Sequence, residues 1–60
     1  MEEVAKLVEE LKAQYDEFVK NAELLTKDGN KAAGGRARKA SLAMEKLTKE
    51  FRKKSIEATK

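Results

Sequence analysis

Cysteine, histidine, proline and tryptophan are all absent from this 60-residue chain. Without cysteine the chain can form no disulfide, no thiolate metal site and no thiol redox centre. Without histidine it lacks the commonest general base and metal ligand in proteins. The sequence therefore predicts no metal site and no other cofactor. It also predicts no enzymatic activity, because Ser41 and Ser55 have no histidine to activate them and the paired acidic residues lie on an open helix surface.

Long apolar runs are missing as well, since 42% of the residues are charged. The apolar stretches are only a few residues long, far below the ~20 residues that cross a bilayer. The chain opens MEEVAKLVEEL, with acidic residues where a secretory signal would carry basic ones. We therefore expect a cytoplasmic protein that does not enter a membrane and takes no small-molecule substrate.

The absence of proline permits long helices, and residues 2–27 carry the pattern of one. Apolar residues there alternate spacings of four and three, which is typical of a heptad seam. Their acidic first turn suits the N-terminal end of the helix dipole. The seam consists of Val4, Val8, Leu11, Tyr15, Phe18, Ala22 and Leu25, and it leaves Leu7 and Leu24 to one side.

A turn follows at residues 28–30, where Gly29 can take the left-handed conformation that ends a helix and Asn30 can cap the next one. A second helix is predicted over residues 31–58. Its seam repeats the same spacing, first with alanines and then with larger side chains: Ala33, Ala37, Ala40, Met44, Leu47, Phe51 and, after a break at Lys54, Ala58. Leu42 and Ile56 lie off this seam. Because small residues let helices approach closely, the pair should be narrowest near the turn.

These elements predict an all-α fold, an antiparallel αα-hairpin forming a single domain over residues 1–60. Two helices cover such seams poorly, so we expect two hairpins to join into a dimeric four-helix bundle. The expected interface consists of Leu11, Tyr15, Phe18, Met44, Leu47 and Phe51. All three aromatic residues of the chain fall on these seams, which disfavours base stacking on single-stranded nucleic acid.

Charge is divided unequally between the two halves. Residues 1–28 hold eight acidic residues against four lysines, a net −4, and residues 29–60 hold ten basic residues against three acidic ones, a net +7. Lys39, Lys46, Lys53 and Lys60 recur every seven residues and should form one outward column, which can follow a phosphate backbone. The candidate nucleic-acid-binding residues are Lys31, Arg36, Arg38, Lys39, Lys46, Lys49, Arg52 and Lys53.

Gly34 and Gly35 interrupt a sequence that otherwise favours helix, at a cost of about 1 kcal/mol each relative to alanine. They indicate either the close approach of another backbone, from a helix or a nucleic-acid strand, or a frayed or kinked helix start. Basic residues crowd around them, but GxxxxGK[ST] is absent, so this is not a nucleotide-hydrolysing P-loop.

The stretch GNKAAGGRARKA, followed by MEKLTKEFRKKSIEATK, resembles the core of the chlamydial histone H1-like proteins and their short bacterial relatives. The resemblance implies a nucleoid-associated protein that binds DNA with little sequence preference. It points in particular to Lys31, Arg36, Arg38, Arg52 and Lys53. The sequence departs from the chlamydial members in having no long Lys-, Ala- and Pro-rich tail, and it is more similar to the tail-less members.

Three hypotheses follow. In the first, the chain is a histone-like protein of the nucleoid whose basic second helix contacts the phosphates of double-stranded DNA. In the second, it is a protein–protein assembly module in which the acidic first helix pairs with the basic second helix of another chain. A weaker third is recognition of structured RNA by a small four-helix bundle. Binding to random duplex DNA over a range of salt concentrations separates the first from the second.

Overall fold

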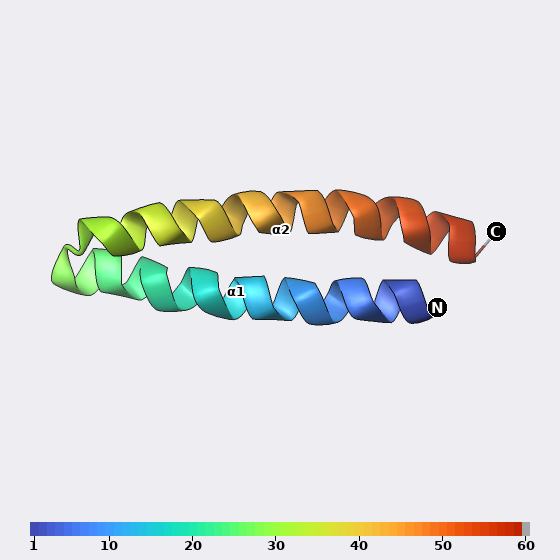
Figure 1. Cartoon of the computed structure of the whole chain (residues 1–60), viewed down its shortest axis with the longest axis horizontal. Coiled ribbons are helices and arrows are strands. Elements are labelled where there is room, and N and C mark those ends of the chain that lie inside the picture. Colours follow the sequence, from blue (N-terminus) through green and yellow to red (C-terminus); the bar gives the residue numbers. More distant parts are fainter. Residues whose placement is uncertain (60) are drawn as a thin grey trace.

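The computed structural model describes residues 1–59 and shows two antiparallel helices of nearly equal length (Figure 1). Helix α1 runs Glu2–Asp28 and helix α2 runs Lys31–Ala58. The hairpin measures 46 × 14 × 11 Å, and both termini lie at the end opposite the turn. The predicted all-α hairpin is therefore confirmed.

The turn uses the two residues that the sequence indicated. Gly29 has φ 64° and ψ 27°, the left-handed conformation in which glycine carries no side-chain penalty, and its N–H donates to the Leu25 carbonyl at 3.0 Å. Asn30 then begins α2: its Oδ1 accepts a hydrogen bond from the Ala33 N–H at 3.1 Å. The turn thus supplies partners for the Leu25 carbonyl at the end of α1 and for the Ala33 N–H at the start of α2, two kinds of backbone group that helix ends leave unpaired.

The tightest packing lies just beyond the turn, where the small residues of α2 meet α1. Ala33, Ala37 and Ala40 are 0, 5 and 3% exposed, and Gly34 is buried beside them. The ribbons lie closest at the turn and separate toward the termini, as the distribution of small and large side chains predicted (Figure 1). Phe51, in the wider half, remains 36% exposed.

The predicted seam of α1 is partly wrong. Leu7 was placed off the seam but is 8% exposed, whereas Tyr15 was placed on it and is 57% exposed. The buried line passes through Leu7 and Asn21, which lie two heptads apart. The cause is that the apolar stripe of α1 is wider than one neighbouring helix can cover, so a partner on one side buries only one edge of it.

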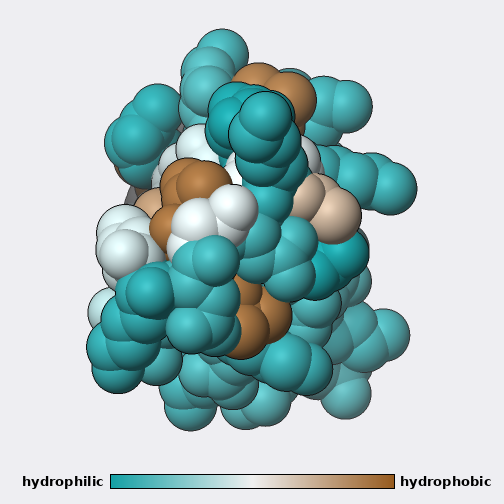
Figure 2. All heavy atoms as spheres, turned by 90° about the vertical axis from the view of Figure 1, so that its left-hand side faces the viewer, coloured by the Kyte–Doolittle hydropathy of each residue, from teal (hydrophilic) through white to brown (hydrophobic). Residues whose placement is uncertain are grey.

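Most of the surface is hydrophilic. In the view onto the turn end, polar side chains dominate and apolar ones show between them in separate patches (Figure 2). Leu42 and Ile56, which were predicted to lie off the seam of α2, are 63 and 64% exposed. Within residues 1–59, neither helix is long and apolar enough to cross a membrane.

Candidate nucleic-acid interface

The lysines and arginines of α2 gather on the side of the helix that faces away from α1. At about 100° per residue, six of them project within about 60° of the direction opposite the buried alanines. We call this set the outer cationic face; all six are exposed, and they are Lys31, Arg38, Lys39, Lys46, Lys49 and Lys53. From first to last they span about 33 Å of helix, and Leu42, which is 63% exposed, projects among them from the same side.

Two other predicted binding residues lie beside this face. Arg52 is exposed and projects about 80° from its centre, and Arg36 is exposed but projects about 120° from it, toward the edge of α1. Lys60, predicted to end the lysine column, lies outside the described residues. The structure therefore gathers six of the eight candidate binding residues into one row and sets Arg36 and Arg52 at its two edges.

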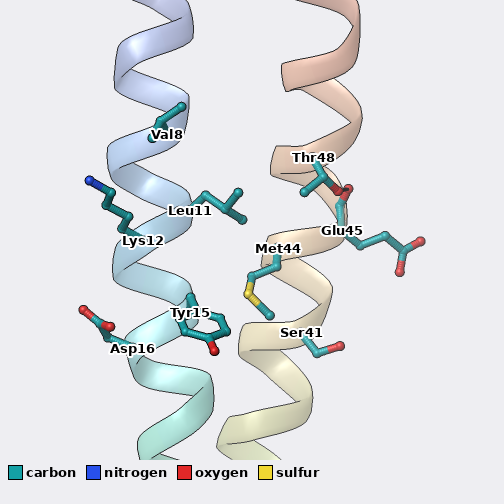
Figure 3. Close-up of a pocket in the computed structure, with 9 residues that line it drawn as sticks. All are labelled: Val8, Leu11, Lys12, Tyr15, Asp16, Ser41, Met44, Glu45 and Thr48. Carbon is teal, nitrogen blue, oxygen red and sulfur yellow. Dashed lines mark hydrogen bonds between the residues drawn. The ribbon is translucent and has the colours of Figure 1, made fainter.

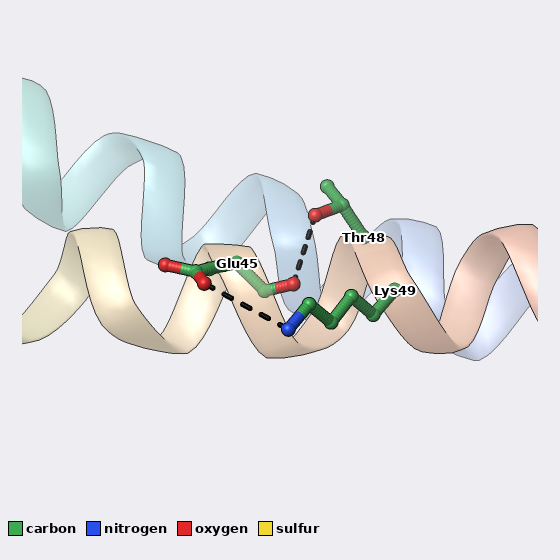
Figure 4. Close-up of polar contacts among 3 residues, drawn as sticks. All are labelled: Glu45, Thr48 and Lys49. Carbon is green, nitrogen blue, oxygen red and sulfur yellow. Dashed lines mark hydrogen bonds and ion pairs between the residues drawn. The ribbon is translucent and has the colours of Figure 1, made fainter.

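Among the described residues, one ion pair involves the outer cationic face. Glu45 Oε1 lies 3.9 Å from Lys49 Nζ, with both side chains about two-thirds exposed, while the Glu45 carbonyl accepts a hydrogen bond from the Thr48 hydroxyl at 3.0 Å (Figure 4). An exposed pair one helical turn apart contributes only about 0.3–0.5 kcal/mol. Lys49 can therefore exchange this contact for another anion at little cost.

Arg36 is held by a residue that the sequence analysis did not single out. Its Nε donates to Asn21 Oδ1 at 2.7 Å, and the Asn21 Nδ2 donates in turn to the Glu17 carbonyl at 2.8 Å and to Glu17 Oε1 at 3.3 Å. Asn21 is only 2% exposed. Its signal in the sequence was its spacing, since it lies seven residues after Gln14 and fourteen after Leu7.

A second ion pair joins the open ends of the helices. Lys54 Nζ lies 3.4 Å from Glu3 Oε2, so this cation of α2 is turned toward α1. Arg36 and Lys54 are 18 residues apart, which is about five full helical turns, so they project from the same flank of α2. We call this side, with Glu3, Glu17, Asn21, Arg36 and Lys54, the polar flank of the hairpin.

The other flank holds an apolar groove between the helices (Figure 3). Leu11, Tyr15 and Met44 point into the space between α1 and α2, and Lys12 and Asp16 point outward at its rim. A neighbouring hollow nearer the turn is lined by Phe18, Leu25 and Gly34 among others. Of the six predicted interface residues, Leu11, Tyr15, Phe18 and Met44 thus reach this flank, while Leu47 and Phe51 lie outside both linings.

The glycine pair is part of an unbroken helix. α2 continues through Gly34 and Gly35, so the helix start is not frayed. A Cβ at Gly34 would lie 3.2 and 3.4 Å from the two methyl carbons of Leu25, whereas a Cβ at Gly35 would meet only an Arg38 nitrogen at 4.0 Å. The absence of a side chain at Gly34 therefore makes room for Leu25 of α1, whereas a side chain at Gly35 would have open space around it.

Within residues 1–59, no group of three or more acidic side chains is placed to hold a metal ion. The basic side chains of α2 give the hairpin a positively charged surface. The outer cationic face presents flexible ammonium groups along a rigid helix, and Arg36 presents a guanidinium anchored to Asn21. Such groups suit the oxygen atoms of phosphates.

Comparison with known proteins bears on what these charges serve. Residues 5–60 match the model of a family described as histone H1-like protein Hc1. No curated protein and no solved structure matches the chain. The match includes the turn, the whole of α2 and all but the first turn of α1, and it confirms the resemblance drawn from GNKAAGGRARKA and the segment that follows it. The chain belongs to the histone H1-like protein Hc1 family.

Proposed function

We propose that the chain is a nucleoid-associated protein that binds double-stranded DNA without sequence preference, and that it does so through the outer cationic face of α2. The observation that supports this most strongly is the set of six exposed cations along one side of α2. Membership of a histone H1-like family supports the same conclusion.

The chemistry of the face favours phosphates over bases. Lysine is a compact point charge on a flexible stem, and five of the six residues are lysines. Contacts of this kind position a protein on the duplex but read no sequence. The two remaining candidates, Arg36 and Arg52, extend the contact at the edges of the face. Helix α1 carries the net negative charge and turns away from the DNA.

The affinity should therefore depend steeply on salt. A dimer that neutralises about six phosphates should show a slope of log affinity against log salt near −5. Fluorescence anisotropy with two duplexes of unrelated sequence, measured from low to physiological salt, gives both the slope and the sequence preference. A double-stranded RNA of the same length as competitor tests the RNA alternative.

The decisive variant removes three charges from the face without disturbing the hairpin. Replacing Lys39, Lys46 and Lys53 together by Gln should make the slope shallower by about 2.7 per chain and weaken binding to both duplexes equally. The matched control replaces Lys6, Lys12 and Lys20 of α1 by Gln, which changes the net charge by the same amount. If both triple variants lose the same affinity, the attraction is diffuse and α2 is not a site. If the wild type fails to bind DNA at low salt, the DNA-binding function is refuted and the hypothesis of a protein–protein assembly module is kept.

We propose in addition that two hairpins associate through the apolar groove. The groove lies on the flank away from Arg36 and Lys54, so association would leave the polar flank at the surface and would reach the outer cationic face only at Arg38. Among the large apolar residues that line the groove, Tyr15 is the exposed one, at 57%, and it would bury the most surface against a partner. The wild type should then melt at a temperature that rises with protein concentration. Tyr15→Glu should remain helical but run as a monomer in analytical ultracentrifugation; a monomeric wild type refutes the dimer.

A further inference from the structure

The polar flank contains one contact that differs in kind from its neighbours. Asn21 is a buried amide in the interface between two helices, where an apolar residue would ordinarily pack. A buried amide costs stability unless its hydrogen bonds are made. Here they are made across the hairpin, because Asn21 Oδ1 accepts from Arg36 Nε at 2.7 Å.

The orientation of the Asn21 amide is set from its own helix. Its Nδ2 donates to the Glu17 carbonyl at 2.8 Å, and a carbonyl can only accept. The amide oxygen must therefore point the other way, toward α2. This arrangement leaves Oδ1 as a fixed acceptor, and it determines where the Arg36 guanidinium lies and how its plane is turned.

The contact fixes Arg36 without neutralising it. Lys49 forms an ion pair with Glu45, and Lys54 forms one with Glu3. Within residues 1–59, Arg36 belongs to neither of these two pairs. Asn21 uses only the Nε–H, and within the same residues no hydrogen bond occupies the two terminal nitrogens. These nitrogens carry four N–H groups in one plane, which can bind two oxygen atoms of a phosphate together.

We propose that Asn21 is a positioning residue that holds the Arg36 guanidinium ready for a phosphate of the DNA backbone, at the edge of the outer cationic face. The proposal rests on the proposed DNA-binding function. Lys39 lies about 60° from Arg36 around α2, between it and the centre of the face, so the two cations can contact the same strand. An aspartate at position 21 would keep an acceptor for Arg36 but cancel its charge, and its second oxygen would face the Glu17 carbonyl and carboxylate, which cannot donate to it. The neutral amide is therefore the informative feature.

The test compares two substitutions of Asn21, one that leaves the net charge unchanged and one that adds a negative charge. Asn21→Leu removes the bond and fills the interface with an apolar side chain, so the hairpin should melt at the same or a higher temperature. Asn21→Asp keeps an acceptor for Arg36 and adds one negative charge, but it loses the two hydrogen bonds from Nδ2 to Glu17, so the hairpin should melt at a lower temperature. We expect both variants to bind duplex DNA about tenfold more weakly than wild type, the magnitude typical of one lost charged hydrogen bond. For Asn21→Asp the salt slope should also become shallower by about 0.9 per chain.

Two controls separate positioning from net charge and from folding. Ala13→Asp adds the same charge at an exposed site of α1, eight residues away, and should bind like wild type. Arg36→Lys keeps the charge but lacks the planar Nε–H, and it should lose affinity with an unchanged salt slope. If one Asn21 variant fails to fold, the other decides the question together with Arg36→Lys.

The outcomes distinguish this proposal from the proposed function. If the wild type does not bind DNA, the proposed function has failed. If the wild type binds and Arg36→Lys, Asn21→Leu and Asn21→Asp all bind equally well, DNA binding stands and the positioning role is refuted. Weaker binding by Arg36→Lys together with unchanged binding by Asn21→Leu also refutes it, because Arg36 would then act without the amide.

Discussion

Replacing the two adjacent glycines of α2 by alanine, one at a time, should give two different gains in stability. Alanine is favoured over glycine in a helix interior by about 1 kcal/mol. At Gly35 the new Cβ meets only an Arg38 nitrogen at 4.0 Å, so we expect the whole gain. At Gly34 it would lie 3.2 Å from a Leu25 methyl carbon, which must give way by a few tenths of an ångström.

Leu25 can make that movement because its side chain is 39% exposed. A small displacement costs less than the ~0.5–1.5 kcal/mol of a distorted rotamer, so Gly34→Ala should still stabilise, but by about half as much as Gly35→Ala. For a domain of this size, 1 kcal/mol corresponds to about 4–8 °C in melting temperature. Thermal denaturation followed by circular dichroism at fixed protein concentration resolves the difference.

A double-mutant cycle assigns the difference to its cause. In a Leu25→Ala background, the two glycine replacements should stabilise equally because the obstructing methyl groups are gone. Equal gains in the wild-type background would refute the packing of Leu25 on Gly34. A loss of stability at Gly35 would show that another backbone approaches there, which is the alternative that the sequence raised for the glycine pair.

Two further replacements test the turn. Gly29→Val should destabilise the hairpin by about 1 kcal/mol or more, because a β-branched residue resists the left-handed φ of 64°. Gly29→Asn should cost clearly less, because asparagine adopts this conformation more readily. Chemical denaturation measures both variants, and equal losses of stability would contradict this reasoning. Asn30→Ala should destabilise the hairpin by about 1 kcal/mol, because it loses the hydrogen bond from the Ala33 N–H, whereas Asn30→Asp should keep that bond. The same unfolding curves measure both variants, and an unchanged stability of Asn30→Ala would mean that the cap contributes nothing.

Local signals in the sequence were sufficient for the architecture of the hairpin. The heptad spacings gave two helices, and Gly29 with Asn30 gave the break between them. Both signals are local, since the turn depends on the backbone preferences of two residues and each helix depends on the periodicity within one continuous segment. The alanine-rich start of α2 likewise gave the narrow end of the hairpin, since the size of a side chain limits how closely two helices approach.

Which edge of the apolar stripe is buried could not be read in the same way. Val8, Tyr15 and Ala22 satisfy a heptad as well as Leu7, Gln14 and Asn21 do. Hydrophobicity favoured the first set, but a single partner helix covers only one edge, and the structure buries Leu7 and Asn21 of the second set. The choice depends on a long-range contact, the hydrogen bond from Arg36 to Asn21, which no local pattern contains.

The same limit applied to the candidate binding residues. Charge and period placed the lysines on the outward side of α2, but they could not tell that Lys54 and Arg36 turn toward α1. A helical wheel gives the direction in which a side chain leaves the helix. It does not give the partner that a long, flexible side chain finds across an interface.

The three sides of α2 differ in what they leave available. One flank is apolar and open, the other is joined to α1 by polar contacts, and the outer side is cationic. If the open flank binds a second copy, the polar flanks stay at the surface and each dimer carries two outer cationic faces on one particle. Linking two weak, nonspecific phosphate contacts in this way raises the overall affinity without any contact to a base. Assembly through the groove would then be what makes so small a cationic helix an effective DNA-binding protein, and the polar flank would add to each face one arginine already set in place.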